Sequence, residues 1–188
     1  SDINDSYKLH QRVMMGFPAQ VPEGERVLYR LDYQNNPLRI SMLVQSHSPS
    51  TWVSLERSGY LLQPAASKSF YPEFSANQIF RFRFAANPTK RLGKHSEHCG
   101  KRVGLIHENN QMEWLKKKGR ESGFQIVEVA ITRLYTPNGE KYDQYLGKWI
   151  QLIYQGVRFD GVLQVTDSRL FSLAVSNGIG SGKGFGFG

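Results

Sequence analysis

The stretch Gln78-Ile-Phe-Arg-Phe-Arg-Phe-Ala85 has the most regular alternation of apolar and polar side chains in the sequence. Successive side chains of a β-strand point to opposite faces, so the stretch predicts a strand with Phe80, Phe82 and Phe84 on one face and Arg81 and Arg83 on the other. We expect the aromatic face to lie on the core. The arginines would then face either phosphates or water.

The segments on both sides of this strand alternate between helical and extended patterns. Before it we expect a helix within residues 5–16, capped by Asp5 or Ser6 and ended by Gly16. Strands are expected over 26–33 and 38–45, joined by a turn at 34–37, and an irregular connection over 46–75 surrounds one short element at 51–55. After it we expect a helix over 109–119 whose Met112, Trp114 and Leu115 face the core. Strands are expected over 125–134, 148–154 and 158–166, with a turn at 137–139, and a last helix over 168–176 is capped by Asp167. This order predicts an α+β protein with two units in tandem, residues 1–88 and 103–188, joined by residues 89–102.

The composition favours a polyanionic partner such as nucleic acid. The chain has 24 Lys and Arg against 16 Asp and Glu, which gives a net charge of +8 and a pI of about 9.6. No run of eighteen apolar residues and no signal-peptide pattern occurs, so neither membrane spanning nor secretion is expected. The single Cys99 excludes an intrachain disulfide and favours a reducing, cytoplasmic location.

The positive charge is concentrated in the middle of the chain, where residues 89–120 contain nine basic residues and three acidic ones. The glycines and like charges of residues 89–102 predict a mobile hairpin that contacts phosphates, or, alternatively, a solvated charged loop. Three candidate zinc ligands, His95, His98 and Cys99, lie within five residues of this stretch. With no fourth ligand nearer than His107, their spacing is poor for zinc, and no metal site is predicted.

Tyr7 and His10 lie three residues apart on the first predicted helix, whose buried stripe contains Leu9 and Val13. They therefore share one face. An imidazole titrates near neutral pH and can take a proton from a hydroxyl nucleophile or give one to an alkoxide, while a phenol can orient either group. The pair suits transfer of a phosphoryl group without a metal, although so short a motif also occurs by chance.

The glycine-rich end, residues 177–188, does not match the common phosphate-binding motifs. A Walker loop would need Gly at Asn177 and Ser or Thr at Gly184, and no register fits the dinucleotide fingerprint. Both motifs also follow a strand, whereas this stretch follows a predicted helix. This stretch was the main candidate binding site for a nucleotide or dinucleotide, so the sequence does not support nucleotide hydrolysis or hydride transfer. Backbone N–H groups and Lys183 could still contact an RNA backbone, or the stretch could simply turn into a final strand.

In this order of elements and motifs, the chain resembles the CRISPR RNA-processing endoribonucleases of the type I-E Cascade complex, a RAMP superfamily group with two ferredoxin-like, RRM-like domains. The resemblance covers nearly the whole chain in the family's order, so it is far more specific than any one motif. The residues that carry it are Tyr7-x-x-His10, Phe80-Arg-Phe-Arg-Phe-Ala-Ala-Asn-Pro-Thr-Lys-Arg91, Gly100-Lys-Arg-Val103, Glu113-Trp-Leu115, Phe159-Asp-Gly-Val-Leu163 and Gly178-Ile-Gly-Ser-Gly-Lys-Gly-Phe-Gly186.

The resemblance implies two tandem ferredoxin-like domains with antiparallel sheets and helices on one face. It also implies cleavage of precursor CRISPR RNA without metal or cofactor, in which the ribose 2′-OH attacks the adjacent phosphate and leaves a 2′,3′-cyclic phosphate and a 5′-OH. His10 would transfer the proton, and Tyr7 would orient the reacting groups.

The partners implied by the resemblance are a repeat stem-loop and the other Cascade subunits. The implied RNA contacts are Lys90, Arg91, Lys101 and Arg102, with Arg12 and Arg133 near the family's other basic contacts. The family has a strand before the Tyr-x-x-His helix and another after the glycine-rich end, so each sheet is expected to be one strand short here and to leave an unpaired edge.

Two other functions compete with that one. The first is a non-catalytic RNA-binding subunit built from the same folds. The second is a metal-dependent nuclease, which would need clustered carboxylates, and the scattered Asp and Glu residues of this sequence form no such cluster.

Overall fold

The structure is a computed structural model of the chain, and it describes residues 5–20, 22, 24–33, 40–95, 99–134, 139–145, 147–152 and 154–187. The helices of this part are α1 (Ser6–Met14), α2 (Val53–Arg57), α3 (Glu108–Glu121), α4 (Ser168–Asn177) and the short 3-10 helix η2 (Lys183–Phe185). The strands are β1 (Leu28–Tyr33), β2 (Ile40–Gln45), β3 (Ile79–Ala86), β4 (Thr89–Arg91), β5 (Arg102–Gly104), β6 (Phe124–Arg133), β7 (Gly139–Asp143), β8 (Lys148–Leu152) and β9 (Val157–Val165). No helix among the described residues is long and apolar enough to cross a bilayer.

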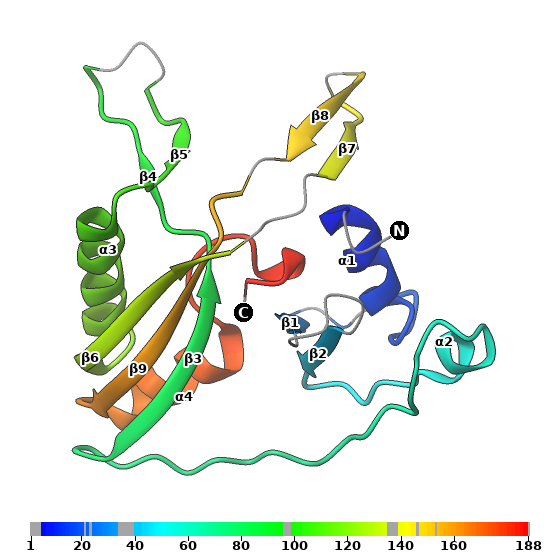
Figure 1. Cartoon of the computed structure of the whole chain (residues 1–188), viewed down its shortest axis with the longest axis horizontal. Coiled ribbons are helices and arrows are strands. Elements are labelled where there is room, and N and C mark those ends of the chain that lie inside the picture. The colour runs from blue at the N-terminus through cyan, green and yellow to red at the C-terminus, as the bar shows by residue number, and fades with distance from the viewer. Residues whose placement is uncertain are drawn as a thin grey trace.

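The main sheet has the order β3-β9-β6, with both pairs antiparallel. The phenylalanines of β3 pack on the core: Phe82 and Phe84 contact a cluster around the fully buried Phe159 and Leu115, and Phe80 contacts a second cluster around Phe171. Since Leu115 comes from α3 and Phe171 from α4, both helices cover the same face of the sheet (Figure 1). The predicted α+β class, with antiparallel sheets and helices on one face, is confirmed.

The N-terminal part of the chain forms a smaller layer in which α1 packs beside the β1–β2 pair (Figure 1). Asp5 begins α1 as predicted, because its Oδ1 accepts hydrogen bonds from the N–H groups of Tyr7 and Lys8 at 2.9 and 3.2 Å. Val13 of α1 and Tyr29 of β1 share a buried cluster. The predicted turn at 34–37 lies outside the described residues.

The pairing of β3 differs from the expected organisation. The sequence analysis assigned this strand to the first unit, but β3 is paired with β9 along its whole length, from Ile79 opposite Gln164 to Ala86 opposite Val157. A boundary after residue 88 would separate two paired strands. The helix–strand–strand–helix order of α1-β1-β2-α2 recurs in α3-β6-β9-α4, with the β7–β8 pair inserted between β6 and β9, and β3 adds a strand to the second group. The division into units stays a prediction, and this pairing favours a boundary between α2 and β3.

Two other elements differ from the predictions. The strand predicted over 148–154 is present as β8, but it pairs with β7, which the sequence analysis missed. The charged sequence Gly-Glu-Lys-Tyr-Asp has almost no apolar side chain to reveal a strand, because the hairpin is exposed. In α3, Gln111 is buried at 2% exposure in place of the predicted Met112, and its Nε2 donates to Leu105 O at 2.8 Å.

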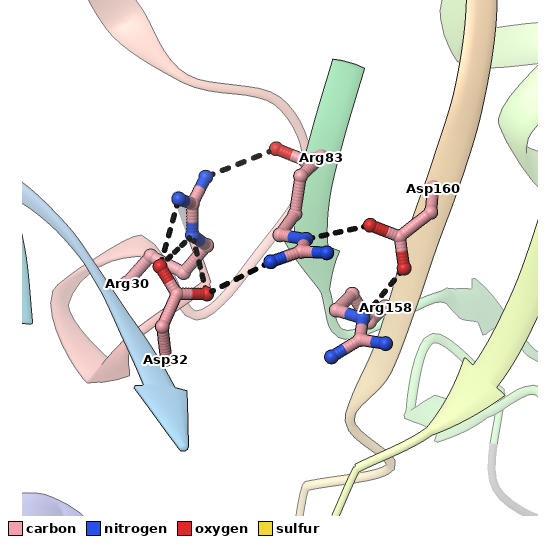
Figure 2. A network of polar contacts seen from close by, with 5 residues as sticks. All are labelled: Arg30, Asp32, Arg83, Arg158 and Asp160. Atoms are coloured by element: carbon pink, nitrogen blue, oxygen red, sulfur yellow. Dashed lines mark hydrogen bonds and ion pairs between the residues drawn. The ribbon is translucent and has the colours of Figure 1, made fainter. Parts of the chain in front are cut away.

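The two layers are connected by a network of arginines and aspartates between β1 and the main sheet (Figure 2). From β1, Arg30 binds Asp32 at 2.9 Å and donates to the carbonyl of Arg83 at 3.2 Å. Arg83 of β3 binds Asp160 of β9 at 2.6 Å and approaches Asp32 at 3.9 Å, and Arg158 binds the other oxygen of Asp160 at 2.6 Å. Arg83, which the sequence left to phosphates or water, is therefore paired with carboxylates.

Asp160 holds a lowered pKa in this network. Partial burial alone would raise its pKa, but the hydrogen bonds and positive charges of Arg83 and Arg158 outweigh that effect. A carboxyl whose pKa is lower in the folded state stabilises the fold above its unfolded pKa, and this stabilisation is lost as the pH falls through the folded value.

We predict that Asp160→Asn lowers the free energy of unfolding by about 1–2 kcal/mol at neutral pH, because two charge-assisted hydrogen bonds are removed. The difference from the unmutated protein should shrink below about pH 4, where the carboxyl of the unfolded chain becomes protonated. Urea unfolding at neutral pH and at a pH below about 4 measures this difference in the free energy of unfolding. Glu113→Gln, which removes an exposed pair with Lys116, is the control and should change stability little. Equal losses of stability at both pH values would contradict the prediction.

Candidate active site

Tyr7 and His10 lie one turn apart on α1, as predicted, and both side chains are half-buried. The helix is held by Leu9, at 4% exposure, and Val13, at 1%, which confirms the predicted buried stripe. The two functional side chains therefore project from a fixed surface rather than from a loop.

The glycine-rich loop, residues 178–187, covers the imidazole of His10. The ring of Phe185 lies 5.5 Å from the His10 ring, at an interplanar angle of 43°. A Cβ added to Gly184 would lie 3.5 Å from Nδ1 and Cε1 of His10, so the backbone of the loop passes directly against the ring. Because Nδ1 is buried, exchange of a proton with a substrate has to use Nε2.

Phe185 belongs to a row of aromatic rings that begins beside His10. Its ring lies 5.3 Å from that of Tyr154, which in turn lies 5.4 Å from that of Phe187. Burial raises the pKa of Tyr154 to about 12, so its phenol stays neutral at physiological pH. Burial, and secondarily the neighbouring Tyr154, also raises the pKa of Tyr29. The ring of Phe185, which lies against the imidazole, is therefore backed by an uncharged aromatic side chain.

Lys183 anchors the glycine-rich loop. Its Nζ donates hydrogen bonds to the carbonyls of Asn177, at 2.6 Å, and Gly178, at 2.7 Å, which end α4. Burial lowers the pKa of Lys183, and the positive charges of Arg26 and Lys118 add to the effect. The predicted contact of Lys183 with RNA stays a prediction, while the structure gives its ammonium a role within the fold.

A second anchor of the loop lies at the end of β3. Ser181 forms a β-bridge with Asn87, and its hydroxyl lies 3.4 Å from the Asn87 carbonyl and 3.4 Å from Thr89 Oγ1. The loop thus runs from the main sheet to α1, and it brings residues near both ends of the chain into one site.

The basic hairpin, formed by β4, β5 and the residues between them, projects from the main sheet on the side of α3, well separated from α1 (Figure 1). Arg91 lies opposite Arg102, and Lys90 lies opposite Val103. All three basic side chains are exposed, as is Lys101. Directly opposed arginines repel one another, so this hairpin favours a bound anion.

The remaining predicted contacts lie elsewhere. Arg12 lies on α1, one turn beyond Lys8, and its guanidinium is 5.0 Å from the centre of the Tyr60 ring. Arg133 lies at the end of β6 and donates a hydrogen bond to the carbonyl of Ile106 at 3.1 Å. His98 and the hairpin residues 96 and 97 lie outside the described residues, so the predicted mobility of the tip stays a prediction. Among the described side chains no group of three or more potential metal ligands is found.

The sequence analysis selected Tyr7 and His10 as candidates but missed Phe185, which packs on the imidazole, and Tyr154, which packs on Phe185. The available signal was the pattern Gly-Phe-Gly-Phe at residues 184–187. Aromatic side chains between glycines indicate ring packing where the backbone must come close to another element.

The fold and the site together define a CRISPR-associated protein. The family model described as "CRISPR associated protein" matches residues 1–188, and the chain belongs to that family. The chain is 30% identical over 196 residues to the CRISPR-associated endoribonuclease Cse3 of Thermus thermophilus, covering 100% of this chain and 89% of the relative. It is 26% identical over 191 residues to the Cascade subunit CasE of Escherichia coli K12, covering 98% of this chain and 89% of the relative.

A solved structure agrees with this assignment. The structure of Thermus thermophilus Cse3 bound to an RNA representing a pre-cleavage complex matches with a TM-score of 0.78 and 29% identity, over 100% of this chain and 88% of that one. Within the family, the chain therefore stands with the Cse3 and CasE endoribonucleases of the type I-E Cascade complex, which confirms the resemblance drawn from the sequence.

We predict that Gly182→Ala destabilises the protein by about 1 kcal/mol or more, because Gly182 has a φ of 81° and an added Cβ would lie 2.9 Å from the ring of Phe187. Thermal unfolding measures the change. Gly93→Ala is the matched control, since no atom lies within 4 Å of its added Cβ and its φ is not positive. Equal stability of the two variants would show that the glycine-rich loop is not held in this conformation.

Proposed function

We propose that this protein is a metal-independent endoribonuclease that binds the stem-loop of CRISPR repeat RNA, cleaves precursor CRISPR RNA and stays bound to the product as a subunit of Cascade. The observation that carries the proposal is the packing of the glycine-rich loop against the imidazole of His10, which lies one turn from Tyr7 on α1. That arrangement occurs in a chain 30% identical to a named endoribonuclease over its whole length.

The reaction requires two proton movements. The ribose 2′-oxygen loses its proton and attacks the adjacent phosphorus, and the bond from phosphorus to the 5′-oxygen breaks as that oxygen gains a proton. The products are a 2′,3′-cyclic phosphate and a 5′-OH. Nε2 of His10 either takes the proton of the 2′-oxygen or gives one to the 5′-oxygen, and water exchanges the other proton. The Tyr7 phenol orients the reacting oxygen by hydrogen bonding. Because the groups available in this site act by moving protons, the chemical step needs no divalent ion.

RNA affinity comes mainly from the basic hairpin. A-form RNA has a deep, narrow major groove lined by phosphates, and a basic projection can reach these without reading bases. Lys90, Arg91, Lys101 and Arg102 lie on such a projection. Arg12 and Arg133 extend the contact toward α1 and the end of β6.

The competing function is that of a non-catalytic RNA-binding subunit. It explains the charge of the hairpin equally well, but it gives no reason for a half-buried glycine-rich loop to pack against an imidazole on a helix that also carries the phenol of Tyr7. The protein acts in the cytoplasm on this proposal, where its exposed Cys99 stays a free thiol.

We predict that the unmutated protein cleaves a labelled repeat RNA in the presence of EDTA and leaves a cyclic phosphate, while His10→Ala does not cleave it. Affinity for the RNA should change by no more than a few fold, since the imidazole acts in the transition state. Gel analysis of the product ends and a filter-binding assay give both results. Tight binding by the unmutated protein without any cleavage would favour the non-catalytic subunit. A requirement for Mg²⁺ in the chemical step would count against the mechanism.

We predict that Lys101→Ala and Arg102→Ala together weaken binding to all stem-loops alike and reduce the slope of log K against log salt by about two, one for each phosphate that the variant no longer neutralises. Lys116→Ala and Lys117→Ala on α3 remove the same charge from another exposed surface and serve as the control. If the double variant binds with normal strength and only its preference among repeat sequences changes, the hairpin reads bases.

A further inference from the structure

The strands of the β7–β8 hairpin present two aromatic side chains to solvent, in addition to the exposed Tyr145 of the connecting turn. Tyr142 and Trp149 lie directly opposite each other in the antiparallel register, and their rings meet edge to face at 5.6 Å and 68°. Tyr142 remains 47% exposed and Trp149 65% exposed. The contact between the two rings therefore leaves a large aromatic surface uncovered, and the described core does not use it.

Strand alternation explains why this surface points outward. Glu140 and Gln151 oppose each other two positions along the hairpin and share the face of Tyr142 and Trp149, and all four side chains are exposed. Ile150 lies on the opposite face and is half-buried. The hairpin thus turns its aliphatic side chain inward and its aromatic pair outward.

The hairpin also lies next to the active site. β7 packs against α1, the helix that carries Tyr7 and His10, and the two lie side by side in Figure 1. An RNA strand whose phosphate reaches His10 therefore passes close to the aromatic pair. The basic hairpin lies apart from α1 and from the aromatic pair. The nucleotides near Trp149 are therefore different from those that the basic hairpin binds.

We propose that Tyr142 and Trp149 form a stacking platform for unpaired RNA bases next to the cleaved phosphate. The inference rests on the proposed function and adds the part of the substrate that this surface binds. Every base has a flat π-face, and stacking on an aromatic side chain binds single-stranded nucleotides without regard to sequence. A protein partner fits the surface less well, because the flanking Glu140 and Gln151 are polar and no aliphatic side chain of the described hairpin borders the rings.

The platform binds bases rather than phosphates. Its face carries the negative charge of Glu140 and no cation among the side chains described there. Removal of the aromatic pair should therefore lower affinity for RNA without changing the salt dependence of binding. Removal of Lys101 and Arg102 from the basic hairpin, in contrast, should change it.

The test combines a protein change with an RNA change. The probe is a repeat stem-loop RNA with single-stranded flanks, in which one unpaired nucleotide at a time is made abasic while its phosphates remain. At the position that stacks, the abasic change should weaken binding to the unmutated protein about fivefold to a hundredfold. The same abasic change should have little effect on RNA binding by Trp149→Ala, because this variant already lacks the ring on which the base stacks.

Two variants serve as controls for the test. Trp149→Tyr keeps a ring and should retain most of the affinity, and Tyr71→Ala removes a ring that is 90% exposed on the segment between α2 and β3 and should change nothing. If Trp149→Ala fails to fold, Tyr142→Leu removes the other ring while keeping an apolar side chain. Circular dichroism and the salt slope are measured for each variant.

The other outcomes separate this inference from the proposed function. The unmutated protein could cleave RNA while each abasic change lowers the RNA affinity of Trp149→Ala and of the unmutated protein equally. In that case the stacking platform is wrong and the proposed function stands. If Trp149→Ala binds RNA normally but no longer assembles with the other Cascade subunits, the surface binds protein instead. If the unmutated protein neither binds nor cleaves the RNA, both proposals are overturned.

Discussion

The packing of the glycine-rich loop against α1 is the interaction on which the site depends. His10 lies near the start of the chain and the loop near its end, and they meet only because Phe185 and the backbone of Gly184 lie against the imidazole. Three connections hold the loop there: Lys183 to the end of α4, Ser181 to Asn87, and the rings of Phe185 and Phe187 on Tyr154. The site is therefore complete only when the main sheet and the N-terminal layer are both in place.

The arginine–aspartate network makes the second connection between these layers, and its chemistry differs from that of the core. Arg83 is about half exposed and Asp32 and Asp160 are partly exposed, so water screens their attraction and each pair adds at most about 1 kcal/mol. Such a network is directional, however, because guanidinium groups bind carboxylates in a fixed geometry. We infer that apolar packing supplies most of the stability, while the network fixes how β1 lies across β3 and β9.

The sequence predicts faces and caps better than it predicts partners. The alternation of β3 identified its aromatic and arginine faces, and Asp5 and Asp167 marked the starts of α1 and α4, because these signals are local. The pairing of β3 with β9 joins residues about 80 positions apart, and no local period records such a choice. β7 was missed because an exposed hairpin needs no apolar side chains. The contact of Phe185 with His10 was missed for a similar reason: the Gly-Phe-Gly-Phe pattern indicates ring packing, but it does not record which residue across the chain is the partner.

The placement of the charges also suggests how binding and chemistry are divided. The cations of the basic hairpin lie apart from His10, and the ammonium of Lys183 is bound to backbone carbonyls. Contacts made far from the reacting phosphate stabilise substrate, transition state and product alike, so they raise affinity without accelerating the chemical step. For an enzyme that must release product, such uniform binding slows turnover. Uniform binding has no such cost for a subunit that keeps its cleaved RNA, because each protein molecule needs to make only one cut. The proposed phosphate binding by the basic hairpin and the proposed proton transfer on α1 are thus compatible with each other.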